Sequence, residues 1–270
     1  MYKYVFCDLD ATLFDDDKNI SDKNYEAINK CNENGSRFFI CTGRVPYCID
    51  GYVGSLSSAN AVTTNGQILK ADNKILYYTK LDDEVSLKVL NFARERNLTV
   101  RAFGDECLYV INDDKNGIYF KIQKEASFDE VESIIREKGL VKIVLVLNKK
   151  EHYHAEDLKK LNLNAEILFS SDTLLEINHA GDSKGCGIKK ICELTDVNIE
   201  DTIGIGDNHN DISMLETVGL PCCPANAVDE VKRICKYISP YTNNESAVAD
   251  IVTATPFCHK SDMLNCQCLI

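Results

Sequence analysis

The stretch YVFCDLDATL at residues 4–13 decides the fold of this chain. It begins with a run of apolar and β-forming residues, which predicts a buried strand from Tyr4 to Leu9. The strand ends at two aspartates, Asp8 and Asp10, and an acidic turn at residues 15–17 follows. If the backbone is still extended there, side chains two residues apart point the same way, so the strand brings two carboxylates to one place.

The same pattern, a short apolar strand that ends in polar residues, recurs along the chain. Residues 37–41 end at Thr42-Gly43-Arg44, residues 61–64 at Asn65-Gly66, and residues 202–205 at Gly206-Asp207. Apolar residues at helical spacing predict helices over residues 22–32, 184–195, 211–218 and 228–235. Near-continuous apolar strands that alternate with helices predict an α/β fold, with a parallel sheet covered on both faces.

The order of predicted helices and strands changes between residues 82 and 180. Helices are predicted over 84–96, 128–138 and 156–161, and strands over 98–103, 107–112, 141–147, 165–169 and 173–178. Successive strands joined by tight turns favour antiparallel pairing, so this segment is predicted to be an inserted α+β domain. The predicted organisation is a discontinuous core of residues 1–81 and 181–257, an insert of residues 82–180, and a patternless tail of residues 258–270.

Composition narrows the classes of partner. The chain of 270 residues has a net charge of −12, which disfavours nucleic acid and anionic lipid as partners. No apolar run approaches the roughly 18–20 residues of a membrane span, and residues 1–10 lack the pattern of a signal peptide. The 13 cysteines are odd in number and have no disulfide-like spacing, so we expect a reduced protein in the cytoplasm. The sequence indicates no oligomeric state.

Four polar groups follow the predicted strands or open a helix of the core. They are Asp8-Leu9-Asp10, Thr42-Gly43-Arg44, Ser183-Lys184-Gly185 and Gly206-Asp207-Asn208-His209-Asn210-Asp211. Ligands of open α/β sheets bind beyond the carboxyl ends of the strands, so we expect the four groups to converge. Asp8, Asp10 and Asp207 would then form a cluster of like charge that needs a cation, and carboxylate oxygens suit Mg²⁺. The Lys184 ammonium and the Thr42 hydroxyl suit the oxygens of a phosphate.

These four groups, in this order, resemble the four signature motifs of the haloacid dehalogenase (HAD) superfamily. The insert between the second and third motifs resembles the large α/β cap, type IIB, of the Cof-type sugar-phosphatase branch. The resemblance covers residues 1–252 and implies a Rossmann-like core with an inserted α+β cap. It also implies a Mg²⁺-dependent phosphatase that acts on small phosphorylated metabolites, sugar phosphates foremost, through an aspartyl-phosphate intermediate.

The resemblance also implies roles for single residues. Asp8 resembles the family's nucleophile, which also binds the metal, and Asp10 resembles the general acid and base, whose backbone carbonyl binds the metal. Asp207 resembles the remaining direct metal ligand, and Asp211 resembles a residue that anchors the metal site without binding the ion. The positions that match the family's phosphate-binding groups are the side chains of Thr42, Lys184 and Asn210 and the backbone amides of Leu9 and Gly43.

The sequence departs from the family pattern in two places that bear on these roles. Ala11 stands where the family usually has Gly, which fits the motif only if the backbone there needs no positive φ. The stretch Pro221-Cys222-Cys223-Pro224 replaces residues that are usually small and apolar in relatives.

Other functions stay open at this point. A phosphomutase, or a phosphatase of flavin precursors or of pyridoxal phosphate, fits the same motifs. A binding module without catalysis is disfavoured, because it would predict loss of Asp8 or Asp10. The sequence does not identify the metabolite, a role for the cysteines of the tail, or a contact between His179 and substrate.

Overall fold

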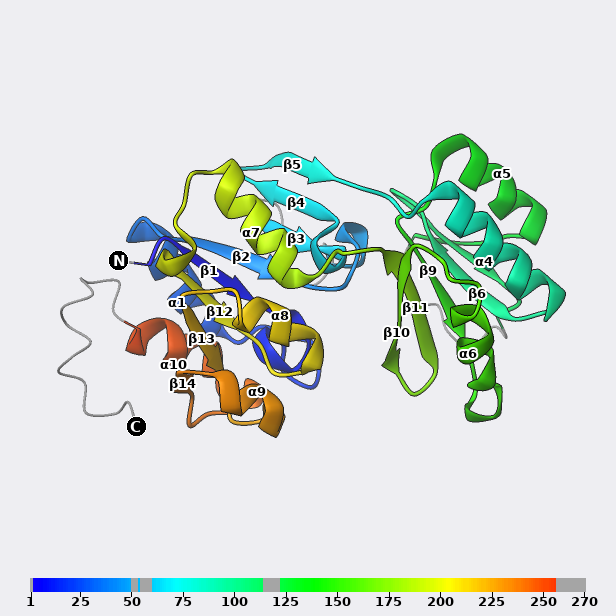
Figure 1. Cartoon of the computed structure of the whole chain (residues 1–270). Helices are drawn as coiled ribbons and strands as arrows, with labels where there is room; N and C mark the ends of the chain where they lie inside the picture. Colours follow the sequence, from blue (N-terminus) through cyan, green and yellow to red (C-terminus); the bar gives the residue numbers. More distant parts are fainter. Residues whose placement is uncertain (1, 50–52, 54–59, 114–121, 256–270) are drawn as a thin grey trace. The chain divides into compact units, whose positions relative to one another are not determined.

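The computed structural model describes residues 2–49, 53, 60–113 and 122–255 of the chain (Figure 1). The chain divides into two compact units, the first formed by Met1–Tyr77 and Ser183–Ile270 and the second by Tyr78–Asp182. The predicted insert begins four residues after the second unit begins and ends two residues before it ends. The predicted tail at residues 258–270 lies outside the described residues.

The first unit is built on a mostly parallel sheet. Its described residues form eight strands in the order β14-β13-β12-β1-β2-β3-β4-β5. The strands are β1 (Tyr4–Cys7), β2 (Arg37–Cys41), β3 (Ala61–Thr63), β4 (Ile68–Ala71), β5 (Lys74–Tyr78), β12 (Thr202–Ile205), β13 (Leu220–Cys223) and β14 (Tyr237–Ile238). Neighbours from β14 to β3 run parallel, and β4 runs antiparallel to β3. This arrangement confirms the predicted α/β class.

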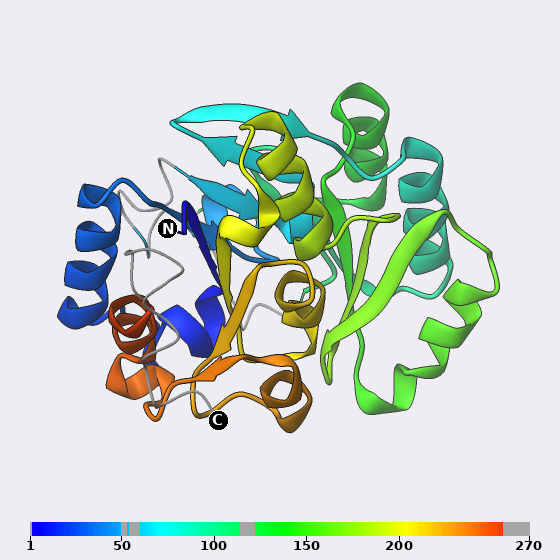
Figure 2. The ribbon, with the colours of Figure 1, turned by 60° about the vertical axis from the view of Figure 1, so that its left-hand side comes forward.

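Helices cover both faces of this sheet, as Figure 2 shows. They are α1 (Asp22–Glu33), α7 (Lys184–Leu194), α8 (Ile212–Leu215), α9 (Asp229–Ile234) and α10 (Ala247–Ala254). Buried residues of α1 and α10 pack with Val5 and Cys7 of β1, whereas those of α7, α8 and α9 pack with Tyr4 and Phe6. Both faces of β1 are therefore buried, which explains why it reads as a continuous apolar run.

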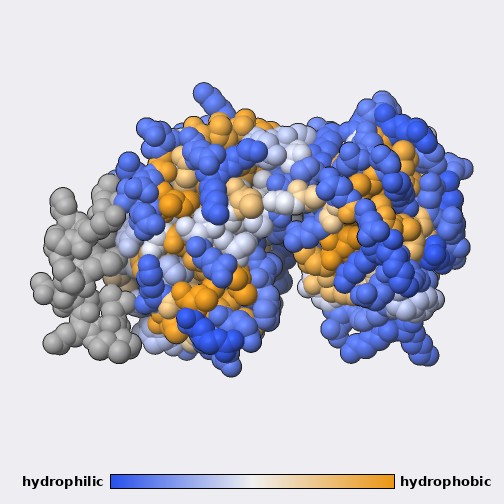
Figure 3. All heavy atoms as spheres, viewed as in Figure 1, coloured by the Kyte–Doolittle hydropathy of each residue, from blue (hydrophilic) through white to orange (hydrophobic). Residues whose placement is uncertain are grey.

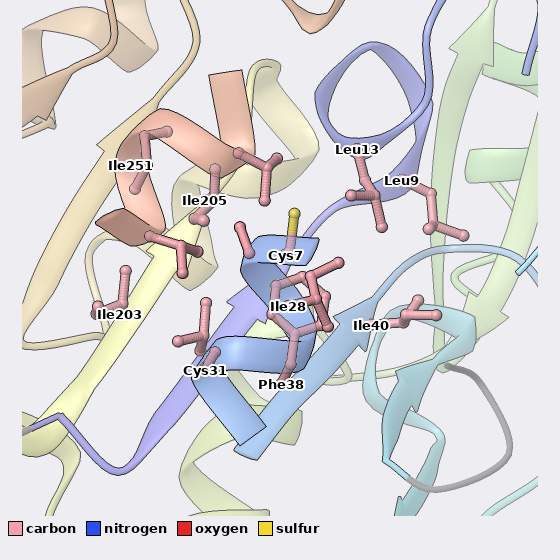
Figure 4. Packing of buried hydrophobic residues seen from close by; sticks show 14 of the residues in the cluster. Cys7, Leu9, Leu13, Ile28, Cys31, Phe38, Ile40, Ile203, Ile205 and Ile251 are labelled. Atoms are coloured by element: carbon pink, nitrogen blue, oxygen red, sulfur yellow. The ribbon is translucent and has the colours of Figure 1, made fainter. Parts of the chain in front are cut away.

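The cluster on the α1 side is drawn in Figure 4. Cys7 from β1, Ile28 from α1 and Ile205 from β12 are completely buried in it. Leu9 and Leu13 extend the same cluster beyond the end of β1. The turn that carries the two strand-end aspartates is thus fixed to the core through its apolar residues.

The second unit has one sheet and its own core. Its described strands lie in the order β10-β11-β9-β6-β7-β8, and all neighbours are antiparallel except β7 and β8. They are β6 (Thr99–Phe103), β7 (Leu108–Ile111), β8 (Gln123–Glu125), β9 (Lys142–Val146), β10 (Ala165–Ser171) and β11 (Leu174–His179), with helices α4 (Asp83–Glu95), α5 (Phe128–Lys138) and α6 (Tyr153–Lys159). Buried residues of all three helices share one cluster with β6, β9 and β11. This is the α+β arrangement predicted for the insert.

Several elements differ from the prediction. The strands β4 and β5 were not predicted from the sequence. Asp72 and Asn73, which lie between them, both have positive φ, as expected for a tight hairpin turn. The strand β13 was not predicted either, because Pro221 argues against a strand. Pro221 is nevertheless paired with Gly204 of β12, and its carbonyl accepts a hydrogen bond from the Lys236 amide at 2.9 Å.

The surface and the thiols complete the description. Polar residues cover most of the view in Figure 3, with smaller apolar areas on each unit. The described cysteines are all free thiols. Among the described residues, no helix is both long enough and apolar enough to span a bilayer.

Candidate active site

The four polar groups of the sequence lie at one edge of the first sheet. β12, β1 and β2 are parallel neighbours, so their carboxyl ends point the same way. The Asp8 amide donates to the Ile205 carbonyl at 2.9 Å, which joins the first group to the strand before Gly206. The Thr42 amide donates to the Val62 carbonyl at 2.9 Å on the other side.

Three carboxylates meet there in the interior. Asp8, Asp207 and Asp211 are buried, and one oxygen from each lies within 4.8 Å of the others. Lys184 is 1% exposed and donates to Asp8 Oδ1 at 2.5 Å and to Asp211 Oδ1 at 2.6 Å. One ammonium group thus faces three carboxylates, which leaves the cluster short of positive charge. The donor set, all carboxylate oxygens, is the kind that suits a hard divalent cation such as Mg²⁺.

Burial and mutual repulsion shift the pKa values of this cluster. Burial, with the charge of Asp211, raises the pKa of Asp8 to about 8, although Lys184 opposes the rise. Burial also raises the pKa of Asp207 to about 6, against the hydrogen bond that Thr12 Oγ1 donates to Asp207 Oδ1 at 2.8 Å. Burial alone would lower the pKa of Lys184, but Asp211 and Asp8 outweigh it and raise that pKa. A bound cation would relieve the carboxylates of this repulsion.

Local sequence explains why Asp211 lies in the cluster. The Asp211 Oδ2 atom accepts hydrogen bonds from the amides of Asp207 at 2.9 Å and Asn208 at 3.1 Å. A Cβ atom on Gly206 would lie 2.5 Å from the Asp211 side chain, so only glycine leaves room for this contact. Asp211 therefore contacts Lys184 and the backbone around Asp207 at the same time, which suits the anchoring role expected for it.

Lys184 is positioned by the start of its helix. The Ser183 side chain accepts a hydrogen bond from the Cys186 amide at 3.1 Å and so caps α7, and Lys184 is the first residue after the cap. Ser183 itself was part of the third sequence group, so this local geometry follows from the residues that the sequence analysis singled out.

Asp10 lies outside the buried cluster. Its Oδ1 atom accepts hydrogen bonds from Arg44 Nη2 at 2.6 Å and from Lys18 Nζ at 2.8 Å, and its Oδ2 atom accepts one from Arg44 Nε at 2.8 Å. Burial would raise the pKa of Asp10, but the hydrogen bonds with Arg44 and Lys18 outweigh it and lower that pKa. Arg44 was noted in the sequence without a role, and Lys18, which follows the acidic turn, was not predicted as a site residue.

The expectation about Ala11 was wrong. Ala11 has a φ of 57°, inside the left-handed region, within a π-helical turn at Leu9–Leu13. A non-glycine residue is strained there, and the neighbouring contacts hold the turn in place. The Asn226 side chain donates to the Ala11 carbonyl at 2.8 Å, and the Asn243 amide donates to Asn226 Oδ1 at 2.9 Å. The turn therefore keeps its shape without glycine.

The remaining predicted residues lie around this cluster in different environments. Thr42 is buried, and its Oγ1 atom accepts a hydrogen bond from the Arg44 amide at 3.2 Å. A Cβ atom on Gly43 would lie 2.9 Å from Asn65 Oδ1, so a larger residue there would displace the Asn65 side chain. Leu9 is buried in the turn after β1. Asn210 is exposed on the 3-10 turn His209–Asp211, and the structure does not bring its side chain into the buried cluster.

His179 belongs to the second unit. It ends β11, and its Nδ1 atom lies 2.8 Å from Asp182 Oδ2.

Comparison with known proteins agrees with this geometry. The family model for haloacid dehalogenase-like hydrolases matches residues 5–252. The chain is 29% identical over 258 residues to the 5-amino-6-(5-phospho-D-ribitylamino)uracil phosphatase YcsE of Bacillus subtilis, covering 93% of this chain and 94% of that protein.

Solved structures show the same fold. A haloacid dehalogenase-like hydrolase from Bacteroides thetaiotaomicron superposes with a TM-score of 0.85 at 24% identity, covering 94% of this chain and 99% of that one. A sugar phosphatase of HAD subclass IIB superposes with a TM-score of 0.79 at 20% identity, covering 93% and 98%. Together with the family match, these similarities confirm the resemblance read from the motifs: this chain belongs to the haloacid dehalogenase-like hydrolase family.

Proposed function

We propose that this chain is a Mg²⁺-dependent phosphatase of small phosphorylated metabolites, with sugar phosphates as the leading substrate class. The observation that carries the proposal is the buried group of Asp8, Asp207 and Asp211 around Lys184 at the carboxyl edge of the sheet. A cluster this acidic repels a phosphate dianion unless a cation is bound. Membership of a hydrolase family, and the phosphatases among its relatives, support hydrolysis as the reaction.

The role proposed for Asp8 follows from its position. As the nucleophile, its carboxylate attacks phosphorus, the bond from phosphorus to the leaving oxygen breaks, and an acyl phosphate forms on Asp8. Water then attacks that phosphorus, the bond from phosphorus to Asp8 breaks, and inorganic phosphate and the free carboxylate result. Lys184 lies 2.5 Å from Asp8 Oδ1 and is placed to hold that carboxylate in one orientation.

Asp10 is proposed to handle the protons of both steps. It gives a proton to the leaving oxygen in the first step and takes one from the attacking water in the second. The side chain of Thr42 and the amides of Leu9 and Gly43 are proposed to bind the phosphate oxygens, with Asn210 joining them from its exposed turn. Asp8, the Asp10 carbonyl and Asp207 would hold Mg²⁺, with Asp211 anchoring them, and the ion would supply positive charge to the phosphoryl group.

The proposal is tested by a panel of phosphorylated metabolites, with released phosphate as the readout. We expect release from at least one small phosphate ester in Mg²⁺, and none when a chelator is present in excess. Asp8→Asn serves as the matched inactive control, because it keeps the shape of the side chain and replaces the attacking carboxylate by a neutral amide. Equal release by Asp8→Asn would contradict the proposed nucleophile.

A second substrate class is favoured by one comparison. The relative from Bacillus subtilis is a 5-amino-6-(5-phospho-D-ribitylamino)uracil phosphatase, and this chain is 29% identical to it over 258 residues. Flavin precursors that carry a ribityl phosphate therefore belong in the panel beside the sugar phosphates. Both substrate classes carry a phosphate monoester on a hydroxylated carbon skeleton, so the same core site would serve either one.

A further inference from the structure

The hydrogen bonds around Asp10 point to a residue that the motif comparison left without a role. Arg44 is the third residue after β2, and its guanidinium group donates to both oxygens of Asp10, at 2.6 Å and 2.8 Å. This bidentate geometry fixes the plane of a carboxylate, which a single hydrogen bond does not do. Lys18 adds one bond at 2.8 Å, to the same Oδ1 atom that Arg44 already contacts.

The backbone around Arg44 is itself held in place. The Arg44 carbonyl accepts a hydrogen bond from the Thr64 amide at 3.0 Å, and the Thr42 carbonyl accepts one from the Asn65 amide at 3.2 Å. The guanidinium group lies 5.9 Å from the centre of the Phe14 ring, and Phe14 is completely buried. The Arg44 side chain is 24% exposed, whereas the Lys18 side chain is 43% exposed. Arg44 is therefore the better fixed of the two cations.

We propose that Arg44 is a positioning residue that orients the Asp10 carboxylate for the step in which the phospho-enzyme is hydrolysed. This inference rests on the proposed function. In the structure Arg44 and Lys18 donate three hydrogen bonds to the Asp10 side chain, and the two from Arg44 hold both of its oxygens. A carboxylate held in one plane keeps one direction toward the attacking water. Arg44 thus acts on the step in which that direction matters, the attack of water on the phospho-enzyme.

An aryl phosphate separates the two steps. Nitrophenolate is a stable leaving group that departs without a proton, so the first step on 4-nitrophenyl phosphate needs little help from Asp10. Hydrolysis of the phospho-enzyme still needs the base. Rapid mixing measures the first step as the initial release of nitrophenol, and the steady rate that follows reports the second step.

The test compares Arg44→Gln with the wild type in Mg²⁺. We expect the initial release to stay within about twofold and the later steady rate to fall about 10-fold to 100-fold, part of the roughly 10²–10⁴-fold that proton transfer contributes. Lys18→Gln should change the steady rate less, because Arg44 still contacts both oxygens. Arg37→Gln is the matched control at the start of β2, since Arg37 pairs with Asp72 instead, at 3.0 Å.

A double variant shows whether Arg44 acts through Asp10. If it does, adding Arg44→Gln to Asp10→Asn lowers the steady rate no further. Arg44→Lys keeps the charge without the bidentate contact, so it should recover only part of the rate. Urea unfolding of each variant establishes that the first unit stays folded.

Three outcomes would overturn the inference. They are a fully additive loss in the double variant, an initial release slowed as much as the steady rate, and a steady rate unchanged in Arg44→Gln. A rise in KM alone would instead make Arg44 a phosphate-binding residue. Failure of the proposed function looks different, because then the wild type itself releases no phosphate in Mg²⁺.

Discussion

Replacing Lys184 by methionine tests how much the Lys184 charge stabilises the buried carboxylate cluster. Lys184 is 1% exposed and lies 2.5 Å from Asp8 and 2.6 Å from Asp211, so methionine fills similar space but leaves two buried carboxylates without their cation. Removing one partner of a buried ion pair costs about 3–5 kcal/mol. We expect Lys184→Met to lose that much unfolding free energy without metal, measured by urea unfolding at pH 8, where Asp8 ionises. Lys189→Met, on the exposed side of α7, should change the unfolding free energy by less than about 0.5 kcal/mol.

The pH dependence of that loss has a defined sign. The pKa of Asp8 is raised to about 8 in the folded chain, so its carboxyl stabilises the fold while protonated, and that contribution is lost as the pH rises through 8. Lys184 opposes the rise, so removing it raises the pKa of Asp8 further. The cost of Lys184→Met should therefore grow above pH 8, by about 1.4 kcal/mol per pH unit at most. A cost below about 1 kcal/mol, or one that shrinks between pH 8 and pH 9, would refute this account of the cluster.

Three further predictions concern catalysis. Asp8→Asn should abolish phosphate release while thermal unfolding stays cooperative. Labelling of that variant by substrate phosphate would contradict Asp8 as the nucleophile. Mg²⁺ should be required and Ca²⁺ should inhibit, because calcium prefers six to eight ligands at longer distances; full activity in excess chelator would count against Asp207 as a ligand. Substitutions in the second unit should change the preferred ester while 4-nitrophenyl phosphate is still hydrolysed. Equal loss on both substrates would contradict a division of labour between the units.

Much of the core could be predicted because strand-end polarity is a local signal. The apolar runs before Asp8, Thr42 and Asp207 each bury both faces of a strand, so the sequence near each one was enough to predict a strand in a parallel sheet. The position of Lys184 at the start of a helix could likewise be predicted from Ser183 before it.

Other features depend on contacts between distant segments. The positive φ of Ala11 is held by Asn226, which is 215 residues away, and no local rule predicts that support. The pairing of Asp10 with Arg44 and Lys18 likewise forms only when the turn after β1 meets the loop after β2. The strand β13 was missed because Pro221 is a local argument against a strand, and parallel pairing with β12 overrides it.

The most direct test of the central claim is chemical trapping of the aspartyl phosphate. The enzyme is mixed with 4-nitrophenyl phosphate and Mg²⁺ in the Asp10→Asn variant, in which hydrolysis of the phospho-enzyme is slowed, and is then reduced with borohydride. An acyl phosphate is reduced to the alcohol, so an aspartyl phosphate at position 8 becomes homoserine. The account predicts homoserine at Asp8 by peptide mass spectrometry, only with substrate and Mg²⁺ both present. Turnover by the wild type with unmodified Asp8 in the trapped variant, or reduction at another carboxylate, would contradict it.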